Sequence, residues 1–350
     1  MIAVVILHVQ VFGGVINNVK EFSLNYELAW TLETICYCAV DVYVIITGYV
    51  YAGKKASLSK LVSLWGTVLL YSTTIPLVLS LLVGNKLSVF SLICNLFPVV
   101  FRRYWFFNAY FALFLFIPSC NWIVNNKRLL ERTLAVSFIL FSIISLFSVN
   151  NDLFNTNGGS SVIWFLNLYL CGAYFKVYGW PSWLTIKKSI ILYCLFIVIM
   201  MLAKNIILWI IYSVIGKYYS WAFYSYTSPL IYGEAICLVS VFSRIRINEG
   251  VLKKAISLIS PLTFGVYLIH ENPEFRETVM HDRFLTTINE PPIIMLSHIM
   301  GGAFVIFVGA LVVEFIRSRL FKIFNVQYVI DRVVRKVHSR IDGFRSLLRI

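Results

Sequence analysis

Long runs of apolar residues, separated by short polar stretches, divide almost the whole chain into segments of similar length. A helix needs roughly 20 apolar residues to cross a hydrocarbon core about 30 Å thick. About ten runs approach this length, and they cover residues 1–17, 28–51, 61–84, 104–124, 132–149, 161–178, 187–211, 228–243, 256–270 and 292–316. We therefore expect an all-α fold, a polytopic membrane protein with about ten transmembrane helices in one bundle.

Two apolar segments fit this pattern less well. The run 256–270 is short and contains Pro261, so its helix could begin before residue 256. The segment 87–101 is also short, contains Pro98 and is followed by two arginines. It is predicted to be interfacial or re-entrant.

Composition supports a membrane protein and excludes several other classes. Hydrophobic residues make up 59% of the chain and charged residues only 13%, whereas soluble domains carry roughly 25% charged residues. A disordered chain, a secreted disulfide scaffold and a soluble enzyme are therefore excluded. The net charge of +14 is typical of nucleic-acid binders, but 28 Phe, 20 Tyr and 9 Trp with so few charges are not. We expect no nucleic-acid partner.

The basic residues sort to one side of the predicted membrane. Alternate loops and the C-terminal tail hold 22 of the 30 Lys and Arg residues, and the other loops hold 8. Because Lys and Arg are enriched in cytoplasmic loops, both termini are predicted to be cytoplasmic. Residues 1–316 then form the transmembrane domain and 317–350 a basic, amphipathic cytoplasmic tail. Its helical spacing favours a surface helix on anionic lipid, with a calmodulin-type or nucleic-acid helix as the alternative.

The seven cysteines predict neither a disulfide framework nor a metal site. Cys36 and Cys38 form a single C-x-C pair, and the other five are scattered. A structural zinc site needs four ligands at recognisable spacing. We therefore expect no bound metal and no permanently bound cofactor.

Ionisable side chains inside predicted spans are costly and mark candidate functional sites. They are His8, Glu33, Asp41, Glu234 and Glu314. Glu314 precedes Arg317 by one helical turn, which favours a local ion pair, and Glu234 suits a structural hydrogen bond or a cavity lining equally well. In one continuous helix, Glu33 and Asp41 would lie about 80° apart around the axis and roughly 12 Å apart along it. They could face one polar interior or simply hold neighbouring helices together.

Two histidines occupy positions of chemical interest. A neutral imidazole, with an ordinary pKa of about 6.5, can take a proton from an attacking hydroxyl. His8 lies in the first apolar run, where a single histidine is more often structural than catalytic. His270 ends the ninth run beside Glu271 and Asn272, with Tyr267 one turn earlier. That group suits sugar hydroxyls, or it is a helix end closed by Asn-Pro.

Four stretches resemble the acyltransferase family 3 membrane proteins, in particular bacterial polysaccharide O-acetyltransferases. Residues 1–8 end in His8, and residues 39–49 read AVDVYVIITGY, similar to the family pattern VDxFFxxSGY. The third stretch, 104–118, begins with Tyr-Trp-Phe, and the fourth is 263–273. The resemblance extends from residue 1 to about 316.

The resemblance implies transfer of an acyl group, usually acetyl, from cytoplasmic acyl-CoA to a saccharide hydroxyl in a bacterial cell membrane. The acceptor is a polysaccharide or its lipid-linked precursor, and acetyl-CoA is a co-substrate. By resemblance His8 is a base or transient acyl carrier, and an Asp at the position of Asp41 orients polar groups nearby. We expect Glu33 or Asp41 to orient the His8 imidazole and favour its protonated form. The candidate residues for binding the acyl donor are Lys54, Lys55 and Lys60. The candidate residues for binding the acceptor are Trp105, Tyr267, His270 and Glu271.

The sequence departs from the family pattern at two places. The family usually has an Arg eleven residues before the histidine, a position that does not exist before His8. Met1 is therefore expected to be an internal methionine of a longer native chain with a truncated first helix. The family often has Arg-x-x-Arg after the second span, where this chain has three lysines, which lack the bidentate fork of arginine.

Two rival functions explain part of the pattern. A transporter or flippase would also have many spans and buried acids, but inverted repeats and paired broken helices are typical of it, and neither is evident. A polysaccharide polymerase normally has a large outer loop, whereas the longest one predicted here is 271–291.

Overall fold

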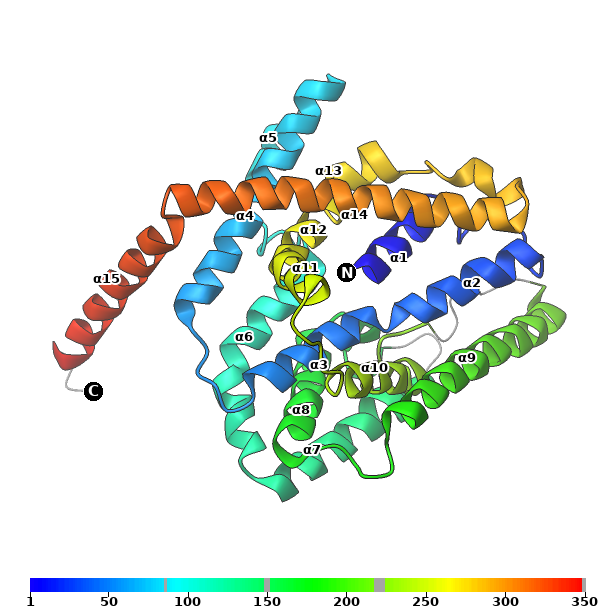
Figure 1. Cartoon of the computed structure of the whole chain (residues 1–350), viewed down its shortest axis with the longest axis horizontal. Coiled ribbons are helices and arrows are strands. Elements are labelled where there is room, and N and C mark those ends of the chain that lie inside the picture. Colours follow the sequence, from blue (N-terminus) through cyan, green and yellow to red (C-terminus); the bar gives the residue numbers. More distant parts are fainter. Residues whose placement is uncertain (85–86, 148–151, 217–223, 348–350) are drawn as a thin grey trace. The chain divides into compact units, whose positions relative to one another are not determined.

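The computed structural model describes residues 1–84, 87–147, 152–216 and 224–347 (Figure 1). Helices and their connections make up this part of the chain, and it contains no strand. Backbone contacts divide the chain into two compact units. Unit 1 comprises Met1–Ala56, Trp105–Asn248 and Met280–Ala303, and unit 2 comprises Ser57–Tyr104, Glu249–Val279 and Phe304–Ile350. Each unit is described by itself below.

Unit 1 contains most of the N-terminal and central helices. They are α1 (Ile2–Phe12), α2 (Leu24–Tyr37), α3 (Ala39–Tyr51), α6 (Trp105–Val124), α7 (Lys127–Phe138), α8 (Val162–Tyr178), α9 (Ile186–Ile215) and α10 (Pro229–Phe242). A π-helical segment, Ile139–Ile144, continues α7. Within this unit α3 packs against α8 and α10, α6 against α7 and α8, and α1 against α2.

Unit 2 is built around α4. Its helices are α4 (Leu58–Val83), α5 (Val89–Leu96), α11 (Val251–Ile259), α12 (Thr263–His270), α13 (Pro273–Phe275) and α15 (Val326–Leu347). The long helix α14 (Pro292–Ile323) begins in unit 1 and ends in unit 2. Helices α5, α12, α13 and α15 all contact α4.

Six helical segments in the described residues are long and apolar enough to cross a membrane. They are Leu24–Tyr51, Leu58–Val83, Trp105–Val124, Ile186–Val214, Val251–His270 and Pro292–Ile323. Three shorter apolar helices, α1, α8 and α10, coincide with further predicted spans. The all-α fold and these apolar helices are confirmed. The ninth span begins earlier than residue 256, at Val251. The count of about ten spans and the cytoplasmic termini stay predictions.

Several predicted boundaries differ from the observed ones. The run 28–51 forms one span, Leu24–Tyr51, in which the single residue Cys38 interrupts the regular α-helix between α2, which holds Glu33, and α3, which holds Asp41. The first helix ends at Phe12 rather than near residue 17, because the chain turns at Gly13 and Gly14. The fifth run begins earlier, at Lys127, and residues 148–149 at its predicted end lie outside the described part of the chain.

Short polar residues set the starts of several helices. The Ser23 and Ser161 side chains accept hydrogen bonds from the backbone N–H groups of Tyr26 and Trp164, at 3.1 and 3.3 Å. Such caps satisfy amides that have no partner inside the helix. They define where α2 and α8 begin, and these two helices carry much of the candidate site.

Close packing of α3 on α8 depends on two glycines. A Cβ atom at Gly48 would lie 2.0 Å from the Tyr169 carbonyl oxygen, and one at Gly172 would lie 1.9 Å from the Ile45 carbonyl oxygen. Small residues let helix backbones approach in this way, which is a common packing device in membranes. The contact places Asp41 of α3 beside α8.

The C-terminal tail is helical, as its spacing predicts. Helix α15 runs from Val326 to Leu347, and residues 348–350 lie outside the described part of the chain. Ser59 of α4 donates a hydrogen bond to Asp331, and Gln327 donates one of 2.9 Å to the same carboxylate. Attachment of the tail to anionic lipid stays a prediction.

Candidate functional site

Glu33 is bound by a glutamine from the first helix. The Gln10 Nε2 atom of α1 donates a 2.9 Å hydrogen bond to Glu33 Oε2, and both side chains are buried in unit 1. The expectation that Glu33 orients His8 directly is not tested by this bond, but the bond gives Glu33 a role of its own. It joins α1 to α2 two residues after His8.

His8 lies on α1 among buried neighbours and is itself partly exposed. Its ring centroid is 5.3 Å from that of Phe12, one helical turn further on. Val4, Val5, Leu7 and Val9 around it are buried. The ring is therefore mostly covered but not fully buried.

Asp41 and Glu234 form a pair of buried carboxyl groups in unit 1. The Trp164 Nε1 atom of α8 donates a 3.2 Å hydrogen bond to Asp41 Oδ1. Glu234 of α10 is fully buried, its carboxyl interacts electrostatically with Asp41, and the Cys38 thiol hydrogen-bonds it. No nitrogen or oxygen of the described residues hydrogen-bonds either Glu234 oxygen. These acids could bind a proton or a polar substrate group, and both roles that the sequence allows for Glu234 stay predictions.

Trp105 belongs to an aromatic stack in unit 1. Its ring lies 5.8 Å from that of Tyr226 with an interplanar angle of 21°, and Tyr226 in turn stacks on Tyr37 at 4.8 Å. Trp105 begins α6, while Tyr226 lies just before α10. The three rings lie face to face and are each partly exposed, so the exposed parts of the stack could contact the apolar face of a sugar ring.

The three candidate donor-binding lysines are divided between the units. Lys54 and Lys55 follow α3 in unit 1, and Lys60 lies in the first turn of α4 in unit 2. All three side chains are exposed. The Lys54 carbonyl accepts a 3.0 Å hydrogen bond from Asn121 Nδ2, which fixes the loop backbone. Exposed ammonium groups of this kind can contact phosphates as point charges.

Tyr267, His270 and Glu271 lie together at the end of α12 in unit 2. His270 Nδ1 is 2.6 Å from the Val266 carbonyl oxygen. Because a carbonyl only accepts, this nitrogen carries the proton and Nε2 is the basic atom. Glu271 accepts a 3.3 Å hydrogen bond from Arg276. Burial raises the pKa of Glu271 to about 7, against the opposing effect of Arg276.

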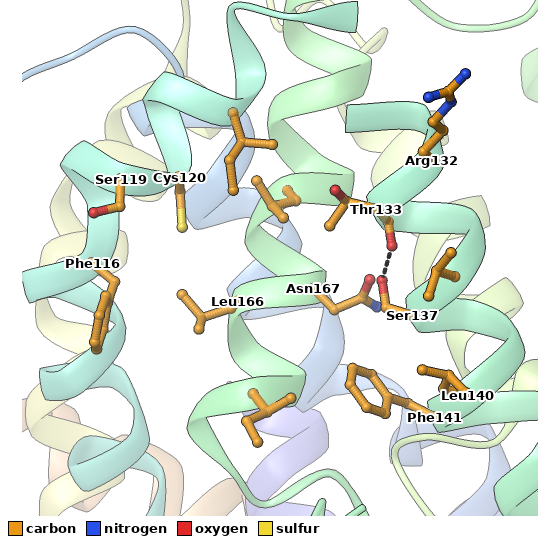
Figure 2. Close-up of a pocket in the computed structure, with 14 residues that line it drawn as sticks. Phe116, Ser119, Cys120, Arg132, Thr133, Ser137, Leu140, Phe141, Leu166 and Asn167 are labelled. Atoms are coloured by element: carbon orange, nitrogen blue, oxygen red, sulfur yellow. Dashed lines mark hydrogen bonds between the residues drawn. The ribbon is translucent and has the colours of Figure 1, made fainter. Parts of the chain in front are cut away.

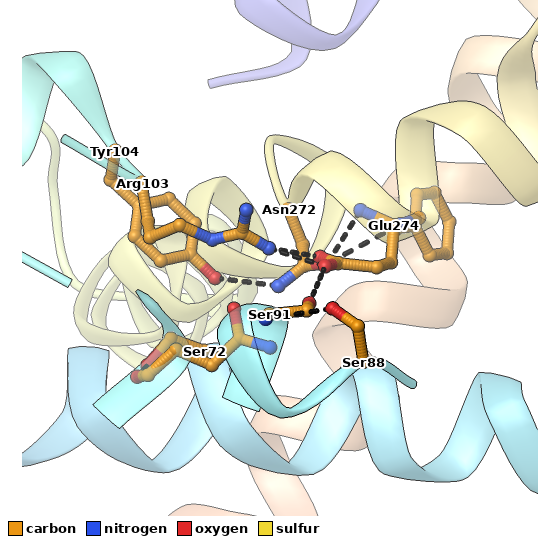
Figure 3. A network of polar contacts seen from close by, with 9 residues as sticks. Ser72, Ser88, Ser91, Arg103, Tyr104, Asn272 and Glu274 are labelled. Carbon is orange, nitrogen blue, oxygen red and sulfur yellow. Dashed lines mark hydrogen bonds and ion pairs between the residues drawn. The ribbon is translucent and has the colours of Figure 1, made fainter. Parts of the chain in front are cut away.

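The turn after His270 is held by a polar network (Figure 3). The Asn272 side chain accepts hydrogen bonds from the backbone of Glu274 and Phe275, which caps α13, and it donates one of 3.0 Å to the Tyr104 hydroxyl. Arg103 forms an ion pair with Glu274. The helix end is thus closed by Asn-Pro as the sequence allowed, and this closure coexists with the buried histidine.

Glu314 forms the local ion pair that the sequence favours. Arg317 Nε and Nη2 donate hydrogen bonds of 2.7 and 2.6 Å to its two oxygens, and the Tyr71 hydroxyl donates a third of 2.6 Å. The carboxylate also lies against Gly265, where a Cβ would be 2.2 Å away. This prediction is confirmed, and Glu314 connects α14 with α4 and α12 inside unit 2.

Sequence reasoning missed three residues of the candidate site. Gln10, Trp164 and Tyr226 provide the partners of Glu33, Asp41 and Trp105, respectively. Gln10 carried a signal, because an amide stands out in an 11-residue apolar helix. The other two lacked one, since aromatic residues are common throughout the chain. Within the described residues, no group of three or more His, Cys, Asp or Glu side chains could hold a metal ion.

Comparison with known proteins gives one match. The family model of an acyltransferase domain, acyltransferase family 3, matches residues 1–316. No curated protein and no solved structure shows significant similarity to the chain. The match and the apolar helices together indicate a multi-pass membrane protein with acyltransferase character. The chain therefore belongs to acyltransferase family 3.

Proposed function

We propose that the protein is an integral membrane O-acyltransferase of the bacterial cell membrane. It moves an acyl group, acetyl in the simplest case, from cytoplasmic acyl-CoA to a hydroxyl of a cell-surface polysaccharide or its lipid-linked precursor. The observation that carries the proposal is the family match over residues 1–316, which includes the helix of His8. We further propose about ten spans with both termini in the cytoplasm, because 22 of the 30 basic residues fall on that side.

His8 is the proposed base of the reaction. Its neutral imidazole takes the proton from the saccharide hydroxyl, and the hydroxyl oxygen attacks the thioester carbonyl carbon. The carbon–sulfur bond breaks, and the departing coenzyme A thiolate receives the proton from His8. An ester and a free thiol result, so atoms and charge balance. A transient acyl group on His8 is the alternative order of the same bond changes.

The two acids near the start of the chain have positioning roles in this proposal. Glu33 acts through Gln10, since the hydrogen bond between them holds α1, and therefore His8, against α2. Asp41 acts through Trp164 and the close contact of α3 with α8. Neither residue needs to touch the substrate, and both are expected to affect the rate through the position of α1 and α3.

The substrates are assigned by charge and surface chemistry. Lys54, Lys55 and Lys60 are exposed cations in the stretch after α3, which suits the phosphates of the acyl donor. The stack containing Trp105 offers its exposed aromatic surface to the saccharide. Tyr267, His270 and Glu271 are the second proposed acceptor group, with a basic Nε2 atom and a carboxyl for sugar hydroxyls.

The proposal is tested by mass spectrometry of the cell's polysaccharides with and without this protein. Loss of acyl groups on deletion, restored by the intact gene, supports the proposal. Unchanged acylation with a changed amount of surface polysaccharide would refute it in favour of a transporter or flippase. A soluble-acceptor assay with isotopically labelled acetyl-CoA then distinguishes acetyl from longer acyl groups.

A further inference from the structure

A hollow of about 590 Å³ lies between α6, α7 and α8, wholly within unit 1 (Figure 2). Its volume falls in the range of small-molecule binding sites. The lining residues recur at helical spacing on each helix, so one face of each of the three helices forms the hollow. The residues from α7 and its π-helical continuation are Arg132, Thr133, Val136, Ser137, Leu140 and Phe141.

The hollow has an apolar rim that is open to the surroundings of unit 1. Phe116, Val136 and Ile163 line it and are 50%, 55% and 43% exposed, respectively. In a bilayer such a surface faces hydrocarbon, and an empty hollow would lose dispersion contacts along its walls. A hydrocarbon chain is therefore the natural occupant of most of its length.

Five polar residues interrupt the apolar lining: Ser119, Arg132, Thr133, Ser137 and Asn167. Of these, Arg132 and Asn167 lie at different depths. Arg132 is exposed at one end of the hollow, near the start of α7, where Lys127 and Arg128 add positive charge. Asn167 of α8 lies beside Ser137 (Figure 2). Arg132 and Ser137 are five residues apart on one helix, which corresponds to about 7.5 Å along its axis.

Asn167 is a buried amide with hydrogen-bonding capacity to spare. The side chain is 3% exposed, and the Tyr232 hydroxyl is its polar partner, in a contact too poor in geometry to satisfy either amide atom fully. Ser137 beside it is engaged with the Thr133 carbonyl. An amide carries two N–H donors and an acceptor oxygen, and leaving part of this capacity unused is costly when it is buried, so a ligand with a hydrogen-bonding group at this depth would be favoured.

We propose that the hollow binds one glycerophospholipid from the bilayer, with its phosphate at Arg132, an ester carbonyl at Asn167 and an acyl chain along the apolar walls. Along this lipid the order is phosphate, ester and hydrocarbon. It matches the order of Arg132, Asn167 and apolar side chains along the hollow. A basic residue at the membrane surface attracts the phosphate, and the Asn167 Nδ2 group donates to the ester carbonyl. The proposal is independent of the acyl-transfer reaction.

Other amphiphiles match this order less well. A prenyl phosphate has no hydrogen-bonding group behind its phosphate, so it leaves Asn167 unsatisfied. The pantetheine arm of coenzyme A has two amides, and below Asn167 the walls offer them only apolar side chains such as Leu140 and Phe141. Of these three ligands, only the glycerophospholipid has a hydrogen-bonding ester at the depth of Asn167 and pure hydrocarbon below it.

Native mass spectrometry of the full chain in detergent tests the proposal with three added lipids. They are phosphatidylglycerol, its ether-linked analogue without ester carbonyls, and a prenyl phosphate. The ester lipid is expected to bind about two- to tenfold more tightly than the ether analogue, as for one hydrogen bond. Equal binding of ester and ether lipids, tighter binding of the prenyl phosphate, or displacement by coenzyme A would overturn it.

Variants separate this site from lipid that surrounds any membrane protein. Asn167→Leu is expected to abolish the preference for the ester lipid, Arg132→Gln to weaken both lipids, and Val136→Trp to fill the hollow and abolish binding. Arg246→Gln, a matched change at an exposed arginine outside the lining, should leave binding unchanged. Misfolding would lower both lipids alike, so the ester-to-ether ratio reports Asn167 itself. Retained binding in Val136→Trp, or a loss in Arg246→Gln equal to that in Arg132→Gln, would contradict the proposal.

Discussion

Replacing Gly48 or Gly172 by alanine tests the close contact of α3 with α8. Alanine at Gly48 would place a Cβ atom 2.0 Å from the Tyr169 carbonyl oxygen, where ordinary contact begins at 3.4 Å. The neighbour is backbone and cannot turn away like a side chain, so the helices must separate by about 1.4 Å. Overpacking of this kind costs about 1–3 kcal/mol, and we expect the upper part of that range.

Thermal unfolding in detergent measures this cost. Six of the seven cysteines are buried, so a thiol-reactive fluorophore reports unfolding of the protein. The midpoint Tm is expected to fall by about 3–10 °C. In the double variant, the helices have already moved apart for the first alanine. The fall in Tm of the double variant should therefore be smaller than the sum of the falls in the two single variants.

Gly301→Ala is the matched control. Gly301 lies in α14 and a Cβ there would meet nothing within 4 Å. Because alanine favours the helix by up to about 1 kcal/mol over glycine, Tm should stay or rise. If Gly48→Ala and Gly172→Ala change Tm no more than Gly301→Ala does, the close approach of α3 and α8 is wrong.

Three further predictions concern the two units separately. Gln10→Leu removes the hydrogen bond to Glu33 and leaves its carboxyl buried without that donor, so the free energy of unfolding should fall by about 1–3 kcal/mol, and an unchanged Tm would contradict it. Glu271 has a folded-state pKa of about 7, above its unfolded value of about 4.3. Its contribution to stability is therefore full below about pH 4 and declines as pH rises to 7. The free energy of unfolding of Glu271→Gln, relative to that of wild type, should therefore increase between about pH 4 and 7 and stay constant above pH 7. Tyr226→Ala removes the stacking partner of Trp105 and should raise KM for the saccharide about two- to tenfold, with KM for acyl-CoA unchanged.

The apolar runs predict where the helices lie, because the length of a run and its hydropathy act locally. They do not predict local interruptions within a run. The run 28–51 contains no Pro or Gly near residue 38, yet Cys38 interrupts the regular α-helix between α2 and α3. Its backbone keeps right-handed helical angles, and Leu24–Tyr51 remains one span. Interruptions of this kind are set by packing against neighbouring helices, which a single sequence does not contain.

The site is predictable to the same limited extent. The free-energy cost of placing an ionisable side chain in a membrane singles out His8, Glu33, Asp41, Glu234 and Glu314. In the structure the four acids are buried and His8 is partly exposed. Their partners come from helices distant in sequence and depend on how the helices pack.

Asn167 illustrates the same limit. Like Gln10, it is an uncharged amide in an apolar run, which marks the residue but not its role. Only the folded structure shows that its amide is buried beside a hollow, with the Tyr232 hydroxyl as its polar partner. The importance of such a residue depends on what surrounds it, which the sequence does not contain.

The central claim is that His8 is the base of an acyl transfer. The most direct measurement is the acyl content of the cell's polysaccharide in a deletion strain that carries the wild-type protein, His8→Ala or the control His281→Ala, at equal levels of folded protein. His281 is 60% exposed and lies outside the candidate site. General-base catalysis contributes about 10²–10⁴ in rate. The account predicts that acylation is lost with His8→Ala and retained with His281→Ala, and wild-type acylation by a correctly inserted His8→Ala protein would contradict it.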